Sequence, residues 1–306
     1  MSHDQPDVWF LSARQRNNPD TILDSRHPDG SAWTSGNTVT LLVHGRTYFH
    51  RLHEAVSRLG SGDLLLFTDW RSDPEELLTD DGVEVGEAFA AAATRGADVR
   101  GLLWRSHAFM QRASMTNRGV GDMVAEAGGQ VLLDMRVRRF GSHHQKLVVI
   151  RHRDAPERDV AFLGGIDLCR GRRDDRDHLG DPQALPMASA YGDRPPRHDI
   201  QVELRGPVVA DAEAVFRERW EDTSPLTPHP LHLLTSWLHR EEKSPDPLPP
   251  PNPDPGATGS TSVQLLRTYP PRRPAYPFAR RGERSIARGY IKALSRAREL
   301  VYVEDQ

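Results

Sequence analysis

Two short apolar runs separated by a charged segment constrain the fold of this chain more than any other feature. The first run lies within Gly141–Ile150 and the second within Val160–Asp167. Each has the length of a β-strand and consists largely of β-branched or other apolar residues. The charged segment Arg151–Asp159 between them contains Pro156, which is typical of a connecting loop. We therefore predict a β-hairpin.

The first strand of this hairpin carries a histidine and a lysine two positions apart. Side chains alternate between the two faces of a strand, so His144 and Lys146 are expected to point the same way. The second run ends in the pair Gly164-Gly165, which lets backbone come close to a neighbour. A neutral imidazole can attack phosphorus, and an ammonium beside it can hold the oxygens. The pattern therefore suits an anionic ligand such as a phosphate.

The spacing of these residues is more informative than their composition. A His-x-Lys pair alone is most often found on a strand surface, whereas this pair is followed by two strands and then Gly164-Gly165-Ile166-Asp167. The whole pattern resembles the phospholipase D superfamily, whose signature is His-x-Lys, four residues and Asp, followed by Gly-Gly or Gly-Ser. Residues 164–174 are similar to the first-half motif of its two-motif members. One position departs, because Arg151 stands where the family has Asp; Asp154 and Asp159 are alternatives for that role, although neither is in register.

Strands and helices alternate along the chain, which predicts an α/β fold: a mixed sheet flanked by helices, with the hairpin added to it. The resemblance implies that this sheet is phospholipase D-like. Predicted strands are 39–43, 63–70, 98–104, 130–134 and 199–204. Predicted helices are 48–59, 85–94, 117–127 and 206–220. Residues 174–197 are rich in Asp, Pro and Gly, which indicates a long loop.

The C-terminal part of the chain is expected to form a separate unit. Residues 1–240 match a first phospholipase D-like half, and the proline-rich residues 241–261 predict a semi-rigid linker. Residues 262–306, with strands at 263–267 and 300–304 and a helix at 285–297, resemble the beginning of a second half. His-x-Lys occurs once in the chain. We therefore expect a complete first half, an incomplete second half, and a site completed by a missing second half or by another chain.

The resemblance implies a two-step phosphodiester exchange through a phosphohistidine, with no metal or cofactor in the core chemistry. It implies that His144 is the nucleophile and that Lys146 holds the phosphate oxygens. Substrate-binding roles are expected for Gly164, Gly165 and Asp167, and supporting roles for His143, Asp174 and His198. By resemblance, Asp174 occupies the place of an acid that orients the histidine of the opposite half.

Composition narrows the class of partner. The formal net charge is −3, so no overall positive field attracts nucleic acid, and the clusters Arg136–Arg139 and Arg170–Arg176 are either solvated loops or sites of anion steering. The N-terminus lacks the features of a signal peptide, and no apolar run approaches the ~20 residues that span a bilayer. We expect a phospholipid substrate at a membrane surface, a cytoplasmic location that is at most peripheral to membranes, and no nucleic-acid partner.

Three functions remain in competition. The first is phospholipase D-type cleavage of phospholipid head groups. The second is the same chemistry on other phosphodiesters, as in a nuclease or a cardiolipin-synthase-like transferase; the acidic balance disfavours a nuclease, and the lack of N-terminal membrane spans disfavours a synthase of that kind. The third is an inactive fragment or half-protein that only binds phosphate or a partner, which Arg151 and the single motif favour.

Overall fold

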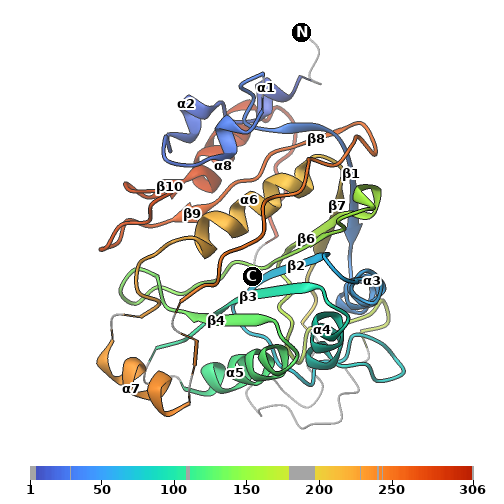
Figure 1. Cartoon of the computed structure of the whole chain (residues 1–306). Helices are drawn as coiled ribbons and strands as arrows, with labels where there is room; N and C mark the ends of the chain where they lie inside the picture. Colours follow the sequence, from blue (N-terminus) through green and yellow to red (C-terminus); the bar gives the residue numbers. More distant parts are fainter. Residues whose placement is uncertain are drawn as a thin grey trace.

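An eight-stranded mixed sheet runs through the molecule, with helices on both faces (Figure 1). The computed structural model describes residues 5–27, 29–107, 111–178, 197–227, 229–239, 241–242 and 244–304, and residues 111–114 without their side chains. The strand order is β4-β3-β2-β5-β6-β7-β1-β8, in which β2, β3 and β4 are parallel and the other pairs are antiparallel. The predicted α/β class, a mixed sheet flanked by helices, is therefore confirmed.

The elements follow the predicted alternation closely. The strands of the main sheet are β1 (Thr34–Leu42), β2 (Leu64–Asp69), β3 (Asp98–Trp104), β4 (Gln130–Asp134), β5 (Leu147–Arg151), β6 (Val160–Gly164), β7 (Gln201–Arg205) and β8 (Thr261–Val263); β9 (Thr268–Tyr269) and β10 (Glu283–Arg284) form a small second sheet. The helices are α1 (Pro6–Trp9), α2 (Ala13–Arg16), α3 (Gly45–Val56), α4 (Val85–Thr94), α5 (Gln111–Glu126), α6 (Val208–Trp220), α7 (Pro230–Leu238) and α8 (Ser285–Arg296). None of the helices in the described ranges is long and apolar enough to cross a bilayer.

Alternation along the central strands divides the core into two layers. Leu65 and Phe67 of β2 pack with α3, α4 and α5, whereas Leu64 and Leu66 pack with α6 on the opposite face. Figure 1 shows α6 on one side of the sheet and α3, α4 and α5 on the other. Because both faces are covered, all six residues of β2 are buried, and the strand is a nearly continuous apolar run.

The strand directions bring several loops to one edge of the sheet, which we call the motif edge. The registers pair Thr68 with Leu147 and Gly164 with Gln201, so β2 and β6 end where β5 and β7 begin. Leu42 also pairs with Gln201, so β1 ends at this edge too. Segments that are far apart in the sequence therefore meet beside the hairpin motif.

Two predicted strands are wrong. The strand predicted at 263–267 is β8, which ends at Val263 and pairs with β1, so it extends the first sheet and does not open a second one. Residues 300–304 form no strand, because no described strand lies beside them to accept their hydrogen bonds, and their apolar side chains are exposed. The loop predicted at 174–197 lies largely outside the described residues, since 179–196 are not among them.

The proline-rich segment predicted as a linker contacts the first sheet and α6. The Trp220 indole donates a hydrogen bond to the Asp246 carbonyl at 2.8 Å, and the Asp246 N–H donates to the Gln130 side chain at 2.8 Å. Further along, the Arg151 guanidinium donates to the Pro253 carbonyl at 2.6 Å. The segment is therefore fastened to the core. The division into 1–240, 241–261 and 262–306 stays a prediction.

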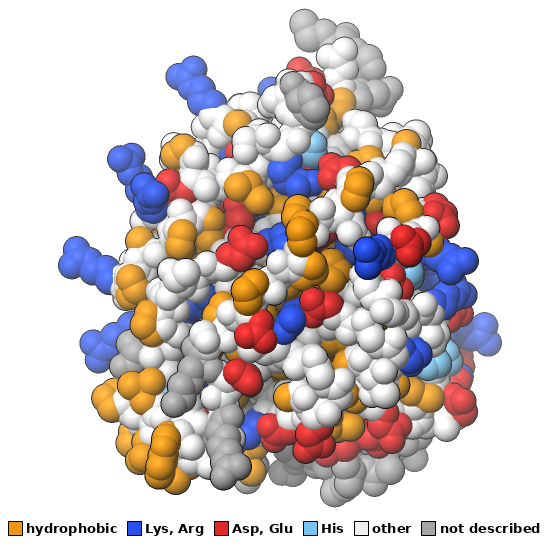
Figure 2. All heavy atoms as spheres, viewed as in Figure 1, with side chains coloured by type: hydrophobic (Ala, Val, Ile, Leu, Met, Phe, Trp, Pro, Cys, Tyr) orange, Lys and Arg blue, Asp and Glu red, His pale blue; other side chains and the backbone are white. Residues whose placement is uncertain are grey.

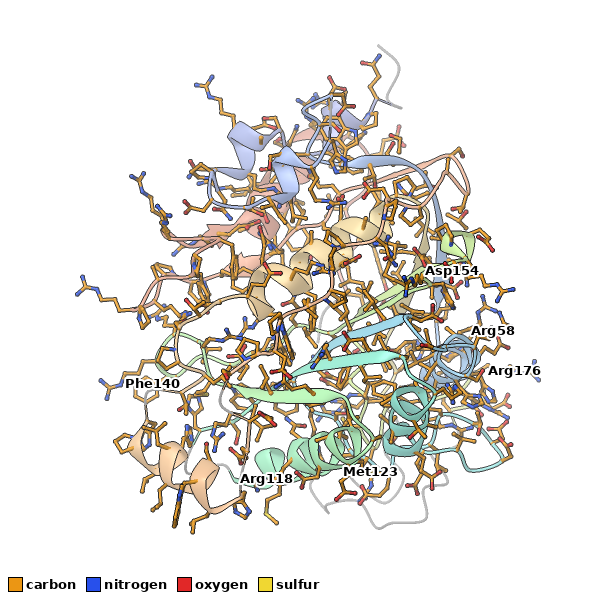
Figure 3. All side chains as sticks on the ribbon, in the orientation of Figure 1. Arg58, Arg118, Met123, Phe140, Asp154 and Arg176 are labelled. Atoms are coloured by element: carbon orange, nitrogen blue, oxygen red, sulfur yellow. The ribbon has the colours of Figure 1, made fainter. Side chains whose placement is uncertain are left out.

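Arg151, the departure from the signature, is a buried anchor at the far end of β5. Its side chain is fully buried; Nε donates to Asp159 at 2.7 Å, Nη1 donates to Glu213 of α6, and Nη2 reaches the proline-rich segment. Asp159 is thus the partner of Arg151, and Asp154 lies on the opposite side of the molecule from Phe140 in Figure 3. Neither aspartate lines the cavity beside the motif. Arg151 therefore anchors the hairpin to α6 and to the proline-rich segment, away from the motif edge.

Replacing Arg151 should destabilise the fold. In Arg151→Met, Asp159 and Glu213 remain buried without their cation, which costs about 3 kcal/mol or more of unfolding free energy. Urea denaturation followed by circular dichroism measures this loss. The control is Arg176→Met, because the Arg176 side chain is 85% exposed and its replacement should change stability by no more than about 0.5 kcal/mol. Equal stabilities of the two variants would contradict the anchoring role.

Candidate active site

The histidine and lysine of the motif lie just before β5, not within a strand as predicted. Residues 141–146 have no regular structure, and β5 begins at Leu147. The intervening Gln145 fastens the segment: its carbonyl accepts a hydrogen bond from the Thr68 hydroxyl at 3.4 Å, and its side chain accepts one from the Tyr269 hydroxyl at 3.1 Å. Both His144 and Lys146 line one cavity of about 420 Å³ at the motif edge.

A buried carboxylate holds the ammonium of Lys146 in place. Lys146 Nζ lies 3.0 Å from Asp167 Oδ1, and Arg172 donates to the other oxygen of Asp167 at 3.2 Å. All three side chains are nearly inaccessible. Asp167 is the only partner of the ammonium among the described residues, and an ammonium has three N–H donors. Because Lys146 lines the cavity, an anion there can approach this cation.

Asp69 lies beside Asp167, and the pKa values of the two carboxyl groups are shifted in opposite directions. Burial raises the pKa of Asp69 well above its usual value, and the negative charge of Asp167 raises it further. Burial also acts to raise the pKa of Asp167, but the hydrogen bond from Asp69 and the charge of Lys146 outweigh it, so this pKa is lowered. The proton therefore resides on Asp69, and Asp167 carries the negative charge that Lys146 needs.

His144 lies at the cavity, and its surroundings favour the neutral form of its imidazole. Partial burial lowers its pKa, and the positive charge of Lys146 lowers it further. Its ring lies against Trp70, with 5.7 Å between the ring centroids, and Trp70 in turn stacks on Trp104. A neutral imidazole has the free lone pair that a nucleophile requires. The arrangement thus provides a nucleophile beside a cation at the same cavity.

His143, predicted as a supporting residue, is buried beneath the same loop. Burial lowers its pKa well below the usual value, and the charge of Arg219 lowers it further. Arg219 donates to Asp134 at 2.8 Å, and Arg136 donates to the same carboxylate at 3.1 Å. His143 is therefore a neutral group that contributes to the cavity wall.

The opposite wall of the cavity comes from residues that the sequence analysis did not identify. It includes Arg219 of α6 together with Arg267, Tyr269 and Tyr276, which follow β8. Among the described residues that line the cavity, the cationic side chains are Arg138, Lys146, Arg219 and Arg267, and there is no carboxylate. Arg219 and Arg267 pair with buried acids behind the wall. The only signal for this wall in the sequence is the mixture of Arg and Tyr at 267–276.

The glycine pair serves packing against β7 as well as access to the cavity. A Cβ on Gly164 would lie 2.4 Å from the Gln201 side chain, and one on Gly165 would lie 2.2 Å from the Asp199 carboxylate. Gly164 lines the cavity, whereas Gly165 and Asp167 do not. Of the three residues predicted to bind substrate, the structure places Gly164 at the cavity and Asp167 behind Lys146.

Asp174 and His198, the other predicted supporting residues, form a second cluster. Asp174 Oδ2 is 2.7 Å from His178 Nδ1 and 2.9 Å from His198 Nδ1, and the rings of His44 and His198 are 5.3 Å apart. Donor atoms of His44, Asp174 and His198 lie within 4.8 Å of one another, a set of groups that can bind a transition metal. Asp174 Oδ1 is buried without a hydrogen bond from the described residues, so it can accept a further imidazole or a cation.

Cys169 and the predicted cluster Arg170–Arg176 lie outside the cavity lining. Cys169 is a buried free thiol whose pKa is raised well above its usual value by burial, so it is no nucleophile. Arg170 and Arg173 form ion pairs with Glu75 and Asp80, and Arg176 extends into solvent. Of the two predicted arginine clusters, Arg136–Arg139 contributes Arg138 to the described cavity lining, and Arg170–Arg176 contributes no residue.

Comparisons with known proteins agree with the sequence pattern. A family model described as phospholipase D matches residues 79–306. Phospholipase D alpha 1 of Cynara cardunculus is 30% identical over 215 residues, which are 58% of this chain and 26% of that protein. Phospholipase D alpha 1 of Oryza sativa subsp. japonica is 31% identical over 214 residues, which are 58% of this chain and 25% of the relative. The chain thus matches about a quarter of the length of these relatives.

A solved structure gives a weaker similarity. Nuc of Salmonella typhimurium, described as a phospholipase D family member, is 12% identical; the match covers 70% of this chain and all of that one, with a TM-score of 0.37. This value is too low to support an argument about the site.

The protonation state of His144 can be measured directly. NMR titration of its ring ¹³C signal, assigned with His144→Gln, should give a pKa below the ordinary value of about 6.5. Lys146→Met should raise that pKa because it removes a neighbouring positive charge, whereas Lys292→Met on α8 should leave it unchanged. A pKa at or above the ordinary value in the unaltered chain would show that the ring is not held neutral.

Proposed function

Because the chain belongs to the phospholipase D family, we propose that it carries the nucleophilic half of a phosphodiesterase site that acts on phospholipid head groups. The observation that supports this proposal is that the His144 imidazole and the Lys146 ammonium line one cavity, whose described lining residues include no carboxylate. Such a cavity attracts a phosphodiester and provides a group able to attack it.

The proposed first step is attack by His144 on phosphorus. A bond forms between the imidazole nitrogen and phosphorus while the bond from phosphorus to the leaving oxygen breaks, and its electron pair departs with that oxygen. Lys146 neutralises the charge that gathers on the phosphoryl oxygens. Asp167 and Arg172 have a positioning role, because they fix the ammonium and do not line the cavity. Water or a second alcohol then takes the phosphoryl group from His144.

An alkoxide leaving group needs a proton, and a general acid must lie within hydrogen-bond reach of it. His-x-Lys occurs once in the sequence. We propose that a second imidazole, from a second half or another chain, supplies this proton and is oriented by the buried oxygen of Asp174 that has no described partner. Lipid cleavage is therefore proposed for the completed assembly, and phosphohistidine formation for this chain.

An activated substrate tests the half-site without the missing acid. p-Nitrophenyl phosphocholine releases p-nitrophenolate, which leaves as an anion near neutral pH and needs no proton donor. The purified chain should release about one equivalent in a burst and retain a phosphocholine label on His144, detectable by mass spectrometry under alkaline conditions. Lys146→Met should slow the burst about 100-fold or more, because the positioned cation is lost.

The matched variants are His144→Ala, which should give neither burst nor label, and His53→Ala on α3, which should behave like the unaltered chain. A label on another residue, or a burst that survives His144→Ala, would reject His144 as the nucleophile. Binding of inorganic phosphate without any label would favour the competing function, a half-protein that only binds the anion.

A further inference from the structure

The helix α7 exposes its apolar face and buries its polar one, the reverse of a typical surface helix. His232 and Ser236 are buried against the body, where the His232 ring contacts the Thr227 hydroxyl at 2.8 Å. The outward side chains are 53–67% exposed and form what we call the α7 patch: Leu231, Leu233, Leu234, Trp237 and Leu238. Figure 2 shows hydrophobic atoms gathered at this place, at the lower left.

Hydrogen bonds to α7, and ion pairs to the residue Glu241 that follows it, hold the helix in this orientation. Arg105, directly after β3, donates to the His232 carbonyl at 3.1 Å and to the Thr235 hydroxyl at 2.9 Å. Arg105 and Arg118 also both bind Glu241, each at 2.5 Å. Because these contacts fix the polar side of α7 to the end of β3, the helix lies at the motif edge with its leucines facing outward.

A second apolar group lies on the loop that leads to the nucleophile. Phe140 is 75% exposed and has a φ of 64°, a conformation that is unfavourable for a bulky residue. The guanidinium carbon of Arg139 lies 4.9 Å from the centroid of the Phe140 ring. Arg138, the residue before Arg139, lines the cavity. In Figure 3 Phe140 projects at the left side of the molecule, on the side where α7 lies.

We propose that the α7 patch and Phe140 form a docking surface for the interface of an anionic phospholipid bilayer. The inference deepens the proposed function and rests on it, since a head group in the cavity keeps its acyl chains in the bilayer. Residues 135–146 and 223–240 contain five Lys or Arg residues and no Asp or Glu. Arg138 and Arg139, which directly precede Phe140, are exposed, which complements an anionic lipid surface. Trp and Leu are the side chains that insert at the boundary of head groups and acyl chains.

A second protein chain fits this surface less well. The α7 patch comprises five side chains, whereas a stable protein interface uses roughly 20–30 residues on each side. The segment before α7 is tied to the loop that carries Arg138, because the Met135 N–H donates to the Leu226 carbonyl at 2.8 Å. Arg138 lines the cavity, so a bilayer on the patch brings lipid head groups toward His144. The helix α8 lies far from α7 in Figure 1. Its exposed apolar residues Tyr290, Ile291 and Leu294 do not line the cavity, so they provide a control.

Co-sedimentation with sucrose-loaded vesicles tests the surface. The purified chain should bind vesicles of phosphatidylcholine and phosphatidylglycerol more tightly than phosphatidylcholine alone. The double variant Leu234→Ser/Trp237→Ser should bind about tenfold more weakly or worse, and Phe140→Ser should also bind more weakly. The control Ile291→Ser/Leu294→Ser on α8, where the two side chains are 67% and 56% exposed, should bind within about twofold of the unaltered chain.

Circular dichroism establishes that each variant is folded, and sedimentation velocity reports its oligomeric state. Equal binding by the α7 variant and the unaltered chain, or equal loss in the α8 control, overturns the proposal. A dimer that the α7 substitutions dissociate also overturns it, because the patch is then a protein interface.

The burst with soluble p-nitrophenyl phosphocholine, measured on the same samples, separates this inference from the proposed function. A normal burst without vesicle binding overturns the docking surface and leaves the chemistry intact. Vesicle binding that depends on the α7 patch, without a burst, supports the surface and overturns the chemistry.

Discussion

The geometry of the cavity depends on one buried charge, the carboxylate of Asp167. It lies between Lys146 and Arg172, and the proton held by Asp69 leaves Asp167 ionised. A lysine side chain is long and flexible, so an ammonium that points at a cavity needs a fixed counterion behind it. Burial lowers the pKa of His144, and the charge of the same ammonium lowers it further, which favours the neutral imidazole. The ammonium that Asp167 fixes therefore contributes both to the position of the charge at the cavity and to the protonation state of His144.

The departure from the family signature has a structural explanation within the hairpin. Arg151 lies at the end of β5 away from the cavity and joins the hairpin loop, α6 and the proline-rich segment. A buried arginine can hold two carboxylates and two carbonyls at once, which an aspartate in that place cannot do. Arg151 therefore fastens the proline-rich segment to the core, and it does not line the cavity at the other end of the strand.

The sequence predicted most strands and helices because the central strands are covered on both faces and stand out as apolar runs, as β2 does. It misplaced His144 and Lys146 within a strand, because β5 begins only where Thr68 of a distant segment pairs with Leu147. Tertiary contacts also decide that Arg219 and Tyr269 face the cavity, and no local pattern reveals them. The helix α7 escaped prediction, since its apolar residues face outward and its polar residues face the body.

The most direct test of the account is the position of a bound oxyanion. In crystals soaked with tungstate, a tetrahedral mimic of a phosphate, the account predicts one anion in the cavity within hydrogen-bond distance of both the His144 ring and Lys146 Nζ, with Asp167 still paired to the lysine. An anion bound elsewhere, for example beside the His44 and His198 rings, with the cavity empty or Lys146 turned away from it, would contradict the account.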